Sequence, residues 1–323
     1  MSVYIHGGLR IPIGVLHGQY RNMRPEMLGA QLINELINRY DISQVDGIFC
    51  GNAVGTGGNI GRLMGLMTNL PNSVPAITVD MQCASALMSI EMAYTHIASG
   101  VMDSAIAGGI ESSSLQPDRM YAAGDNREGL YKVAQFSPND CSPLAMLEGA
   151  ERTIQKHNVL KEDLYPYIIG SHQRAIEALD NPYLQSYIMP ITIDGKACVD
   201  ECIRPKMNEK LLSRMKPLLG PNSITNAGNA CLTHDGAAFV YVSNEKGPFR
   251  IHSIMPWAGN PQFSPEGALE STEAILKRTG LTMDDIDVVE WNEAFAIIDV
   301  LFNKAYPKHL EKYNKLGGAL AYG

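Results

Sequence analysis

The sequence predicts an α/β protein made of two similar halves, with a mostly helical insertion between them. Short apolar or β-branched runs alternate with helical patterns at both ends of the chain. The segment 42–49 has a counterpart at 283–290, each time behind a predicted helix, which indicates an internal duplication. Between residues 113 and 231 the alternation stops, and prolines, tyrosines and short amphipathic helices take its place.

The first half is predicted to contain four strands and three helices. Strands are expected at residues 3–5, 45–50, 77–79 and 104–109. Helices are expected at residues 25–40, at 60–69 and directly after the strand 77–79. The third helix carries apolar residues at a spacing that predicts one buried face: Leu87, Ile90, Tyr94 and Ile97.

The insertion and the second half are also predicted to contain helices and strands. The insertion is expected to hold helices at 144–157 and 162–179. Strands are then expected at 237–242, 249–254 and 286–291, and helices at 265–279 and 294–306. The division we predict is an N-terminal half at 1–112 with 232–246, an insertion at 113–231 and a C-terminal half at 247–323.

Composition excludes several classes of function. The 323 residues carry a net charge of −8 and are 45% hydrophobic, so nothing supplies the basic field that nucleic acid needs. No apolar run is long enough to cross a bilayer, and no signal peptide is visible at the N-terminus. The six cysteines are dispersed, which suits a reducing cytoplasm: Cys50, Cys83, Cys141, Cys198, Cys202 and Cys231. The single C-x-x-x-C pair at 198–202 predicts no metal site.

Cys83 lies where a predicted strand turns into a helix. Unpaired backbone N–H groups and the helix dipole favour negative charge at such a junction, so the thiol could ionise readily and act as a nucleophile. The alternative is a small apolar residue packed under the helix. The glycines of the loop 51–61 miss the G-x-G-x-x-G spacing, which argues against a dinucleotide site.

A basic cluster lies within the otherwise acidic chain: Lys196, Arg204, Lys206, Lys210, Arg214 and Lys216. It could bind an anionic ligand. Because Asp200, Glu201 and Glu209 are interspersed, composition alone favours a solvated face of mixed charge.

Six segments form a specific set when they are taken in chain order. They are RIPIG at 10–14, CASAL at 83–87, GGIESSS at 108–114, AGNACLTHDGA at 227–237, NEAFA at 292–296 and LGGALAYG at 316–323. In this order they resemble the motifs of the thiolase family, the acyl-CoA acetyltransferases. The resemblance implies duplicated βαβαβαββ halves that form a layered α-β-α-β-α core, with the C-terminal half incomplete. In the family the last motif runs into an H-P-x-G segment with the catalytic histidine, and a C-x-G segment follows, so we expect residues beyond Gly323.

The resemblance also implies roles for individual residues. Cys83 would accept the acyl group, and Asn292 would stabilise a developing oxyanion through a held water. Asn292 could instead cap the helix that follows it. Arg204 would lie beside the adenine and phosphates of coenzyme A. The pantetheine channel would be lined by Met146, Leu219, Ala227, Cys231 and Phe295. Two departures from the family pattern are Cys231, where a serine is usual, and Ala145, where biosynthetic members often have a histidine.

The function that the resemblance implies is an acyl-CoA acetyltransferase, which forms or cleaves a 3-ketoacyl-CoA such as acetoacetyl-CoA through a Cys83 acyl-enzyme. Coenzyme A and acetyl-CoA would be substrates, and no tightly bound cofactor, metal, nucleic acid or membrane is expected. The protein would be a cytoplasmic homodimer or homotetramer in fatty acid metabolism. The alternative is a catalytically impaired thiolase-like protein that binds CoA or an assembly partner. The N-E-A-F segment argues against a ketoacyl synthase or a hydroxymethylglutaryl-CoA synthase.

Overall fold

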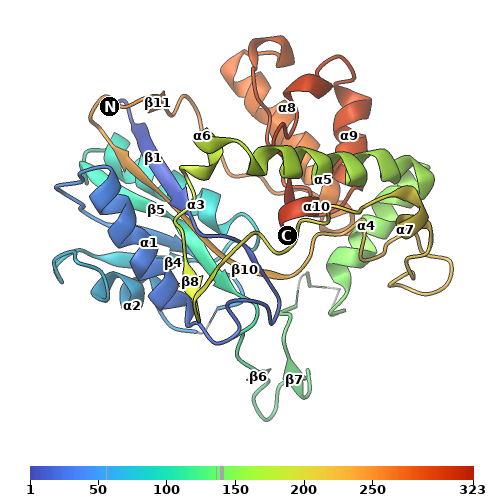
Figure 1. The fold of residues 1–323 in the computed structure, drawn as a ribbon, viewed down its shortest axis with the longest axis horizontal. Helices are drawn as coiled ribbons and strands as arrows, with labels where there is room; N and C mark the ends of the chain where they lie inside the picture. Colours follow the sequence, from blue (N-terminus) through green and yellow to red (C-terminus); the bar gives the residue numbers. More distant parts are fainter. Residues whose placement is uncertain (56, 136, 139–141) are drawn as a thin grey trace. The chain divides into compact units, whose positions relative to one another are not determined.

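The computed structural model describes residues 1–323 except 56, 136 and 139–141, and it divides into two compact units (Figure 1). Unit 1 comprises residues 1–132, 186–201 and 234–254. Unit 2 comprises residues 133–185, 202–233 and 255–323. Cys141, one of the six dispersed cysteines, lies outside the described residues. The division into two halves and an insertion remains a prediction.

Unit 1 is built on a seven-stranded sheet with the order β11-β1-β10-β5-β3-β4, in which β2 also pairs with β10. The strands are β1 (Tyr4–Arg10), β2 (Gly14–Val15), β3 (Ile48–Gly51), β4 (Ala76–Val79), β5 (Ser104–Ser112), β10 (His234–Ser243) and β11 (Phe249–Arg250). β3 is parallel to β4 and β5, whereas β10 is antiparallel to β1 and β5. The long β5–β10 ladder joins Ser112 with Asp235 at one end and Ser104 with Ser243 at the other.

Helices pack on both faces of this sheet, as the side chains of β3 show. Ile48 belongs to a core cluster with Leu32 and Leu36 of α1 (Pro25–Arg39). Its neighbour Phe49 belongs to another cluster with Ile97 of α3 (Ser85–Ala98). Because successive side chains of a strand point to opposite faces, α1 and α3 cover opposite sides of the sheet. The short α2 (Ile60–Leu66) packs against α1, β3 and β4.

The buried face of α3 differs from the predicted one. Its buried residues are Ser85, Ser89, Ala93 and Ile97. Of the predicted face, Ile97 is buried, and Ile90 and Tyr94 pack against the core cluster that contains it. Leu87 is 67% exposed, so the prediction is wrong at this residue. The reason is close packing on the sheet, which small side chains permit. The Ser89 hydroxyl donates to the carbonyl of Gly108 at 2.8 Å and accepts from the Gly108 N–H at 2.8 Å, so helix and strand are in direct contact.

Two small hairpins complete unit 1. They are β6 (Arg119–Met120) with β7 (Leu130–Tyr131), and β8 (Thr192–Ile193) with β9 (Lys196–Ala197). The segment after β9 is fixed to β1, because the Arg10 guanidinium binds both carboxylate oxygens of Asp200 at 2.7 Å. Asp200 also accepts the backbone N–H of Ile13 at 2.8 Å.

Unit 2 is largely helical. Its α-helices are α4 (Ala145–Lys156), α5 (Tyr165–Leu179), α6 (Pro182–Gln185), α7 (Glu209–Ser213), α8 (Gly267–Thr279), α9 (Ile297–Ala305) and α10 (Ala319–Tyr322). The 3-10 turns are η1 (Glu162–Leu164), η2 (Pro261–Glu266), η3 (Met283–Asp285) and η4 (Leu310–Lys312). Its largest core joins α4, α5 and α9 through Ile154, Ile168 and Ile297. Among the described residues, no helix of the chain is long and apolar enough to cross a membrane.

Two strands predicted for the second half are wrong or much shortened. In 286–291, Val289 makes one isolated parallel bridge with Tyr313, and no strand forms. The predicted strand at 249–254 is reduced to β11. A strand needs a continuous hydrogen-bonded neighbour, and a single bridge does not supply one. The helix expected from residue 294 begins at Ile297, because the chain up to Ala296 is held by bonds to another segment.

Candidate active site

Cys83 lies on the turn between β4 and α3, and its side chain is exposed. The preceding residue, Gln82, has a left-handed backbone with a φ of 52°, which is costly for a residue other than glycine. Side chains hold this turn closed. Asp80 accepts the Gln82 N–H at 2.9 Å, and the Ser85 hydroxyl bridges Met81 N–H and the Gln82 carbonyl at 2.8 and 2.5 Å. The result is a sharp strand-to-helix turn that presents a thiol to solvent.

The end of β3 packs directly against the backbone of the first turn of α3. A Cβ on Gly51 would lie 2.5 Å from the backbone nitrogen of Ala86, so a glycine is required for this approach. The loop that leaves β3 is held by Glu111, whose carboxylate accepts the backbone N–H groups of Ala53 and Val54 at 2.8 and 2.9 Å. The position of Cys83 is therefore set by rigid backbone rather than by flexible side chains.

The pKa of the Cys83 thiol is raised above its ordinary value. Burial by the neighbouring chain is the main cause, and the backbone N–H of Cys83 itself acts in the opposite direction. This direction is the reverse of the readily ionised thiol expected from the sequence. Because the side chain is exposed, solvent offsets much of the effect of burial. A nucleophilic role therefore needs a base that takes the proton.

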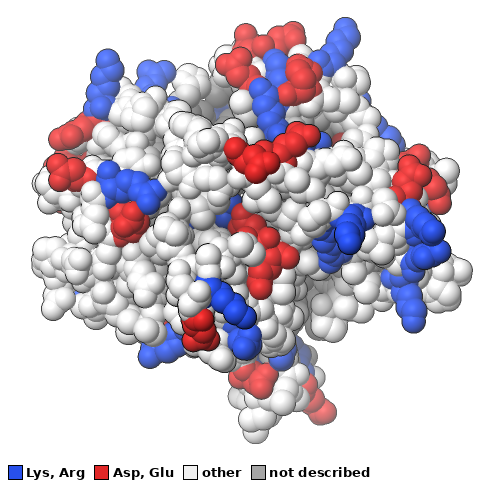
Figure 2. Space-filling model, viewed as in Figure 1, with Lys and Arg blue, Asp and Glu red and all other residues white. Residues whose placement is uncertain are grey.

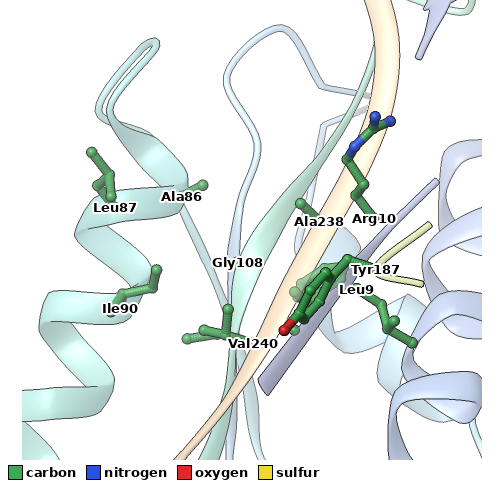
Figure 3. Close-up of a pocket in the computed structure, with 12 residues that line it drawn as sticks. Leu9, Arg10, Ala86, Leu87, Ile90, Gly108, Tyr187, Ala238 and Val240 are labelled. Atoms are coloured by element: carbon green, nitrogen blue, oxygen red, sulfur yellow. The ribbon is translucent and has the colours of Figure 1, made fainter. Parts of the chain in front are cut away.

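An apolar hollow of about 300 Å³ lies beside the first turns of α3, between the helix and the sheet (Figure 3). Ala86, Leu87 and Ile90 of α3 line one side of it. Residues of the sheet and Tyr187 line the other side, among them Leu9, Ala238, Phe239 and Val240. Ala86 is three residues beyond Cys83, so apolar surface begins close to the thiol.

In unit 2, two of the motif segments lie side by side although more than sixty residues separate them in the sequence. The Cys231 N–H donates to the carbonyl of Ala294 at 2.9 Å. The Ala296 N–H donates to the carbonyl of Asn229 at 2.9 Å, and Ala230 forms a β-bridge with Phe295. The A-G-N-A-C and N-E-A-F-A segments are thus locked together by backbone hydrogen bonds.

A buried carboxylate supports this pair of segments. Glu151 of α4 accepts the N–H groups of Ile224 and Thr225 at 3.0 and 2.8 Å, and the Thr225 hydroxyl at 2.7 Å. Asn229 continues the network, because its amide donates to the Ile224 carbonyl and accepts from the Asn226 N–H. Glu151 was not predicted from the sequence, and its signal is weak because an acid inside an amphipathic helix is ordinary.

The structure places the predicted pantetheine residues at different depths of unit 2. Phe295 is 7% exposed, Met146 packs against the same core cluster, and Cys231 is half-buried. Ala227 is exposed and Leu219 is half-buried, and the Leu219 N–H donates to the hydroxyl of Ser223 at 3.2 Å. Phe295, Met146 and Cys231 are brought together by the core and by the locked segments.

Asn292 is exposed and does not cap a helix. The N-cap position of α9 is Ala296, which makes no side-chain capping bond, so the capping alternative for Asn292 is wrong. The Asn292 carbonyl accepts the Ala294 N–H at 2.8 Å, so the Asn292 amide side chain lies at the start of a tight turn. Cys83 belongs to unit 1, whereas Asn292 and all the predicted coenzyme A residues belong to unit 2.

Arg204 is half-buried beside His172 of α5. The Arg204 N–H donates to the imidazole Nδ1 at 3.2 Å. Burial and then the charge of Arg204 lower the pKa of His172 to about 4, so this imidazole is neutral at pH 7. Figure 2 shows positive side chains over α7 and the loops beside it, on the right of the view. In that part of the chain Lys206, Lys210 and Arg214 are exposed or largely so.

A second polar network surrounds Glu293 and was missed at the level of sequence. Glu293 is fully buried and accepts the Ser171 hydroxyl at 2.6 Å and the Asn314 amide at 2.9 Å. Its position inside the N-E-A-F-A motif was a usable signal, because a carboxylate within an apolar segment needs buried donors. Among the described residues, no group of three or more His, Cys, Asp or Glu side chains could hold a metal ion.

Comparison with known proteins identifies the class. The thiolase N-terminal domain matches residues 3–246, and the thiolase C-terminal domain matches residues 249–323. The chain belongs to the thiolase family. This confirms the resemblance inferred from the six motifs.

Individual relatives share this assignment. A Staphylococcus epidermidis protein named "Putative acetyl-CoA C-acetyltransferase VraB" is 31% identical over 330 residues, which cover 97% of this chain and 86% of the relative. Its Staphylococcus aureus counterpart of the same name is 31% identical over 329 residues, with the same coverage. The crystal structure of the Bacillus anthracis acetyl-CoA acetyltransferase superposes with a TM-score of 0.91 at 24% identity. That match covers 100% of this chain and 87% of the other, and it confirms the predicted thiolase-like α/β fold.

Proposed function

We propose that this protein is an acyltransferase that forms or cleaves a 3-ketoacyl-CoA, such as acetoacetyl-CoA, through an acyl group carried on Cys83. The observation that carries the proposal is the exposed thiol on a sharp, internally bonded strand-to-helix turn, within a chain of the thiolase family. A nucleophile needs both access and a fixed direction, and this turn provides both.

In the first step, the Cys83 sulfur attacks the carbonyl carbon of an acyl-CoA. A sulfur–carbon bond forms, the bond from that carbon to the CoA sulfur breaks, and CoA leaves as a thiol with the proton of Cys83. Because burial raises the pKa of Cys83, the attack needs a base that takes the thiol proton. The backbone N–H of Cys83 would stabilise the oxyanion, and one such donor contributes about 3 to 4 kcal/mol to a transition state.

In the second step, a proton leaves the α-carbon of an acetyl-CoA and that carbon attacks the acyl-enzyme. A carbon–carbon bond forms and the carbon–sulfur bond to Cys83 breaks. The departing sulfur takes up one proton, which balances the proton lost from the α-carbon, and the thiol is regenerated. We assign Asn292 to the stabilisation of the enolate through a held water. Its exposed amide and the turn closed by the Ala294 N–H support this role.

Coenzyme A would be held by cations at one end and by apolar side chains along its arm. We assign Arg204 to the phosphates and adenine, and Met146, Leu219, Ala227, Cys231 and Phe295 to the pantetheine arm. The locked pair of segments at 227–231 and 292–296 supports the second assignment, because a rigid wall orders a flexible arm at lower entropic cost. We further propose a cytoplasmic homodimer or homotetramer that serves fatty acid metabolism.

A second candidate is a thiolase-like protein that binds CoA without turnover. Two observations favour it: the pKa of the Cys83 thiol is raised, and Cys231 offers a weaker hydrogen-bond donor than the usual serine. Both candidates predict CoA binding, whereas acyl transfer to Cys83 is predicted by the first alone.

Acyl labelling with radioactive acetyl-CoA separates the two candidates. The wild-type chain and the control Cys198→Ser, which removes a half-buried thiol elsewhere in unit 1, should retain label after denaturation, and Cys83→Ser should not. CoA binding by calorimetry without any labelling would favour the second candidate. Equal labelling of wild type and Cys83→Ser would remove Cys83 from the mechanism.

A further inference from the structure

Asp299 is an isolated acid in the apolar first turn of α9, between Ile298 and Val300. It is 1% exposed. Neither of its carboxyl oxygens has a hydrogen-bond partner of ordinary geometry among the described residues. A buried carboxylate without donors is strongly destabilising, so the protonation state of this group needs an explanation.

Glu293 is the acid whose charge acts on Asp299, and the partners of Glu293 define where the negative charge lies. Ser171 accepts the Gly318 N–H at 3.0 Å, so its own hydroxyl proton points to Glu293 at 2.6 Å. The Asn314 amide donates to the other oxygen at 2.9 Å, and Arg174 Nη2 lies 3.6 Å from it. The Leu320 N–H is a fourth partner at 3.4 Å. All four partners are donors, so the surroundings of Glu293 suit a carboxylate.

One cation cannot neutralise two buried carboxylates. The charged and titratable groups that act on Asp299 or on Glu293 in this cluster are Arg174, Tyr313, Tyr167 and Glu290. Arg174 already pairs with Glu293, so it does not also neutralise Asp299. Tyr313 and Tyr167 are neutral at pH 7. Burial and then the negative charge of Glu293 raise the pKa of Asp299 well above its ordinary value.

We propose that Asp299 is a neutral carboxylic acid at pH 7, buried in the same cluster as an ionised Glu293, and that it is a positioning residue for the segment that carries Asn292. The proton stays on an Asp299 oxygen, and the negative charge stays on Glu293. The two carboxyl groups then carry one negative charge between them, and the Arg174 guanidinium balances it.

The proposal gives Asp299 influence over a residue that it does not touch. Glu293 follows Asn292 directly in the chain, and Asn314 binds both the Glu293 carboxylate and the Trp291 backbone, so this network holds the chain on both sides of Asn292. The importance of that movement for acyl transfer rests on the proposed function. The protonation of Asp299 does not, and it can be tested on the protein without any substrate.

The test compares the unfolding equilibrium constants of wild type and Asp299→Asn as a function of pH. Asparagine keeps the shape and a donor but cannot ionise. In wild type the folded state holds a proton that the unfolded state releases above about pH 4. The ratio of the wild-type constant to that of Asp299→Asn should therefore rise about tenfold for each pH unit above about pH 5, until Asp299 ionises in the folded protein.

The exposed Asp287 supplies a matched control in the same unit, because Asp287→Asn makes the same chemical change in solvent. The ratio of the wild-type unfolding constant to that of Asp287→Asn should not change with pH over the same range. A flat ratio for Asp299→Asn between about pH 5 and 7 would overturn the proposal. If that variant fails to fold, infrared spectra of wild type with carbon-13-labelled aspartate decide instead: a protonated carboxyl band at pH 7 supports the proposal, and its absence refutes it.

The positioning role has its own readout. In ¹H–¹⁵N spectra, the Asn292 and Ala294 amide resonances should stay in place in Asp299→Asn and move in Asp299→Val, which has a similar size but no donor. A purely structural role predicts equal shifts in both variants. Equal shifts would reject the positioning role, whether or not the protein proves to transfer acyl groups.

Discussion

Substitution of Gly51 by alanine tests whether the end of β3 sets the position of Cys83. The new Cβ would lie 2.5 Å from the backbone nitrogen of Ala86 and from the carbonyl carbon of Ser85, where ordinary contacts begin at 3.4 Å. The first turn of α3 must therefore retreat by about 0.9 Å. Both obstacles are backbone atoms, so no side chain can rotate away. Overpacking of this kind costs about 1 to 3 kcal/mol of stability.

Two measurements follow from this displacement. Urea denaturation should show the loss of stability in Gly51→Ala. The rate of Cys83 acylation by acetyl-CoA should fall by up to about a hundredfold, since an error near 1 Å in a reacting group has that effect. Gly236→Ala is the matched control in the same sheet, because its new Cβ would meet nothing closer than 3.9 Å. If Gly51→Ala behaves like Gly236→Ala in both assays, the close contact does not position the thiol.

Three further predictions concern charged and titratable groups. His172 has a folded pKa of about 4 against an ordinary 6.5, so the unfolded chain takes up its proton first, and stability falls as the pH drops from 6.5 to 4. Across that pH range the free energy of unfolding of wild type, measured by urea titration, should fall by about 2 to 3 kcal/mol relative to that of His172→Asn. If the two proteins show the same dependence of stability on pH, the prediction is wrong. Asp200→Ala should lower the free energy of unfolding by about 3 kcal/mol, because it removes the carboxylate that binds both the Arg10 guanidinium and the Ile13 N–H. A loss below about 1 kcal/mol in urea titrations would refute this. Arg204→Ala should weaken CoA binding about tenfold in calorimetry at low salt, less at high salt, and unchanged affinity at low salt would remove Arg204 from the phosphate site.

The fold class was predictable because it depends on periodicity and on motifs that are local in the sequence. The predicted strands at 77–79 and 104–109 fall within β4 and β5, and the thiolase matches confirm the class. Hydrophobicity predicted only part of the buried face of α3: Ile97 is buried as expected, whereas Leu87 is exposed. The contact of α3 with the sheet is made by small residues such as Ser89, whose hydroxyl bonds to Gly108, and a hydrophobic pattern cannot detect that kind of contact.

The second half shows a different limit. A β-branched run such as 286–291 reports a preference for extended backbone, but a strand forms only when a neighbour pairs with it, and Val289 finds one partner. The site residues were named from motifs, and their roles remain proposals. The structure added what motifs do not contain: the buried partners Glu151 and Asp299, and the hydrogen bonds that join residues 227–231 with 292–296.

Asn314 gives the Glu293 network a chemical vulnerability. Its side-chain amide donates to the Trp291 carbonyl and to Glu293, and it accepts the Trp291 N–H, so one side chain fixes two ends of the same segment. Deamidation would replace the donor with a third carboxyl group in a region that has one guanidinium. Burial keeps water away from the amide and so slows that reaction. As long as the fold stays closed, the amide is protected from ageing, and each transient opening of this region exposes it to damage that refolding does not reverse.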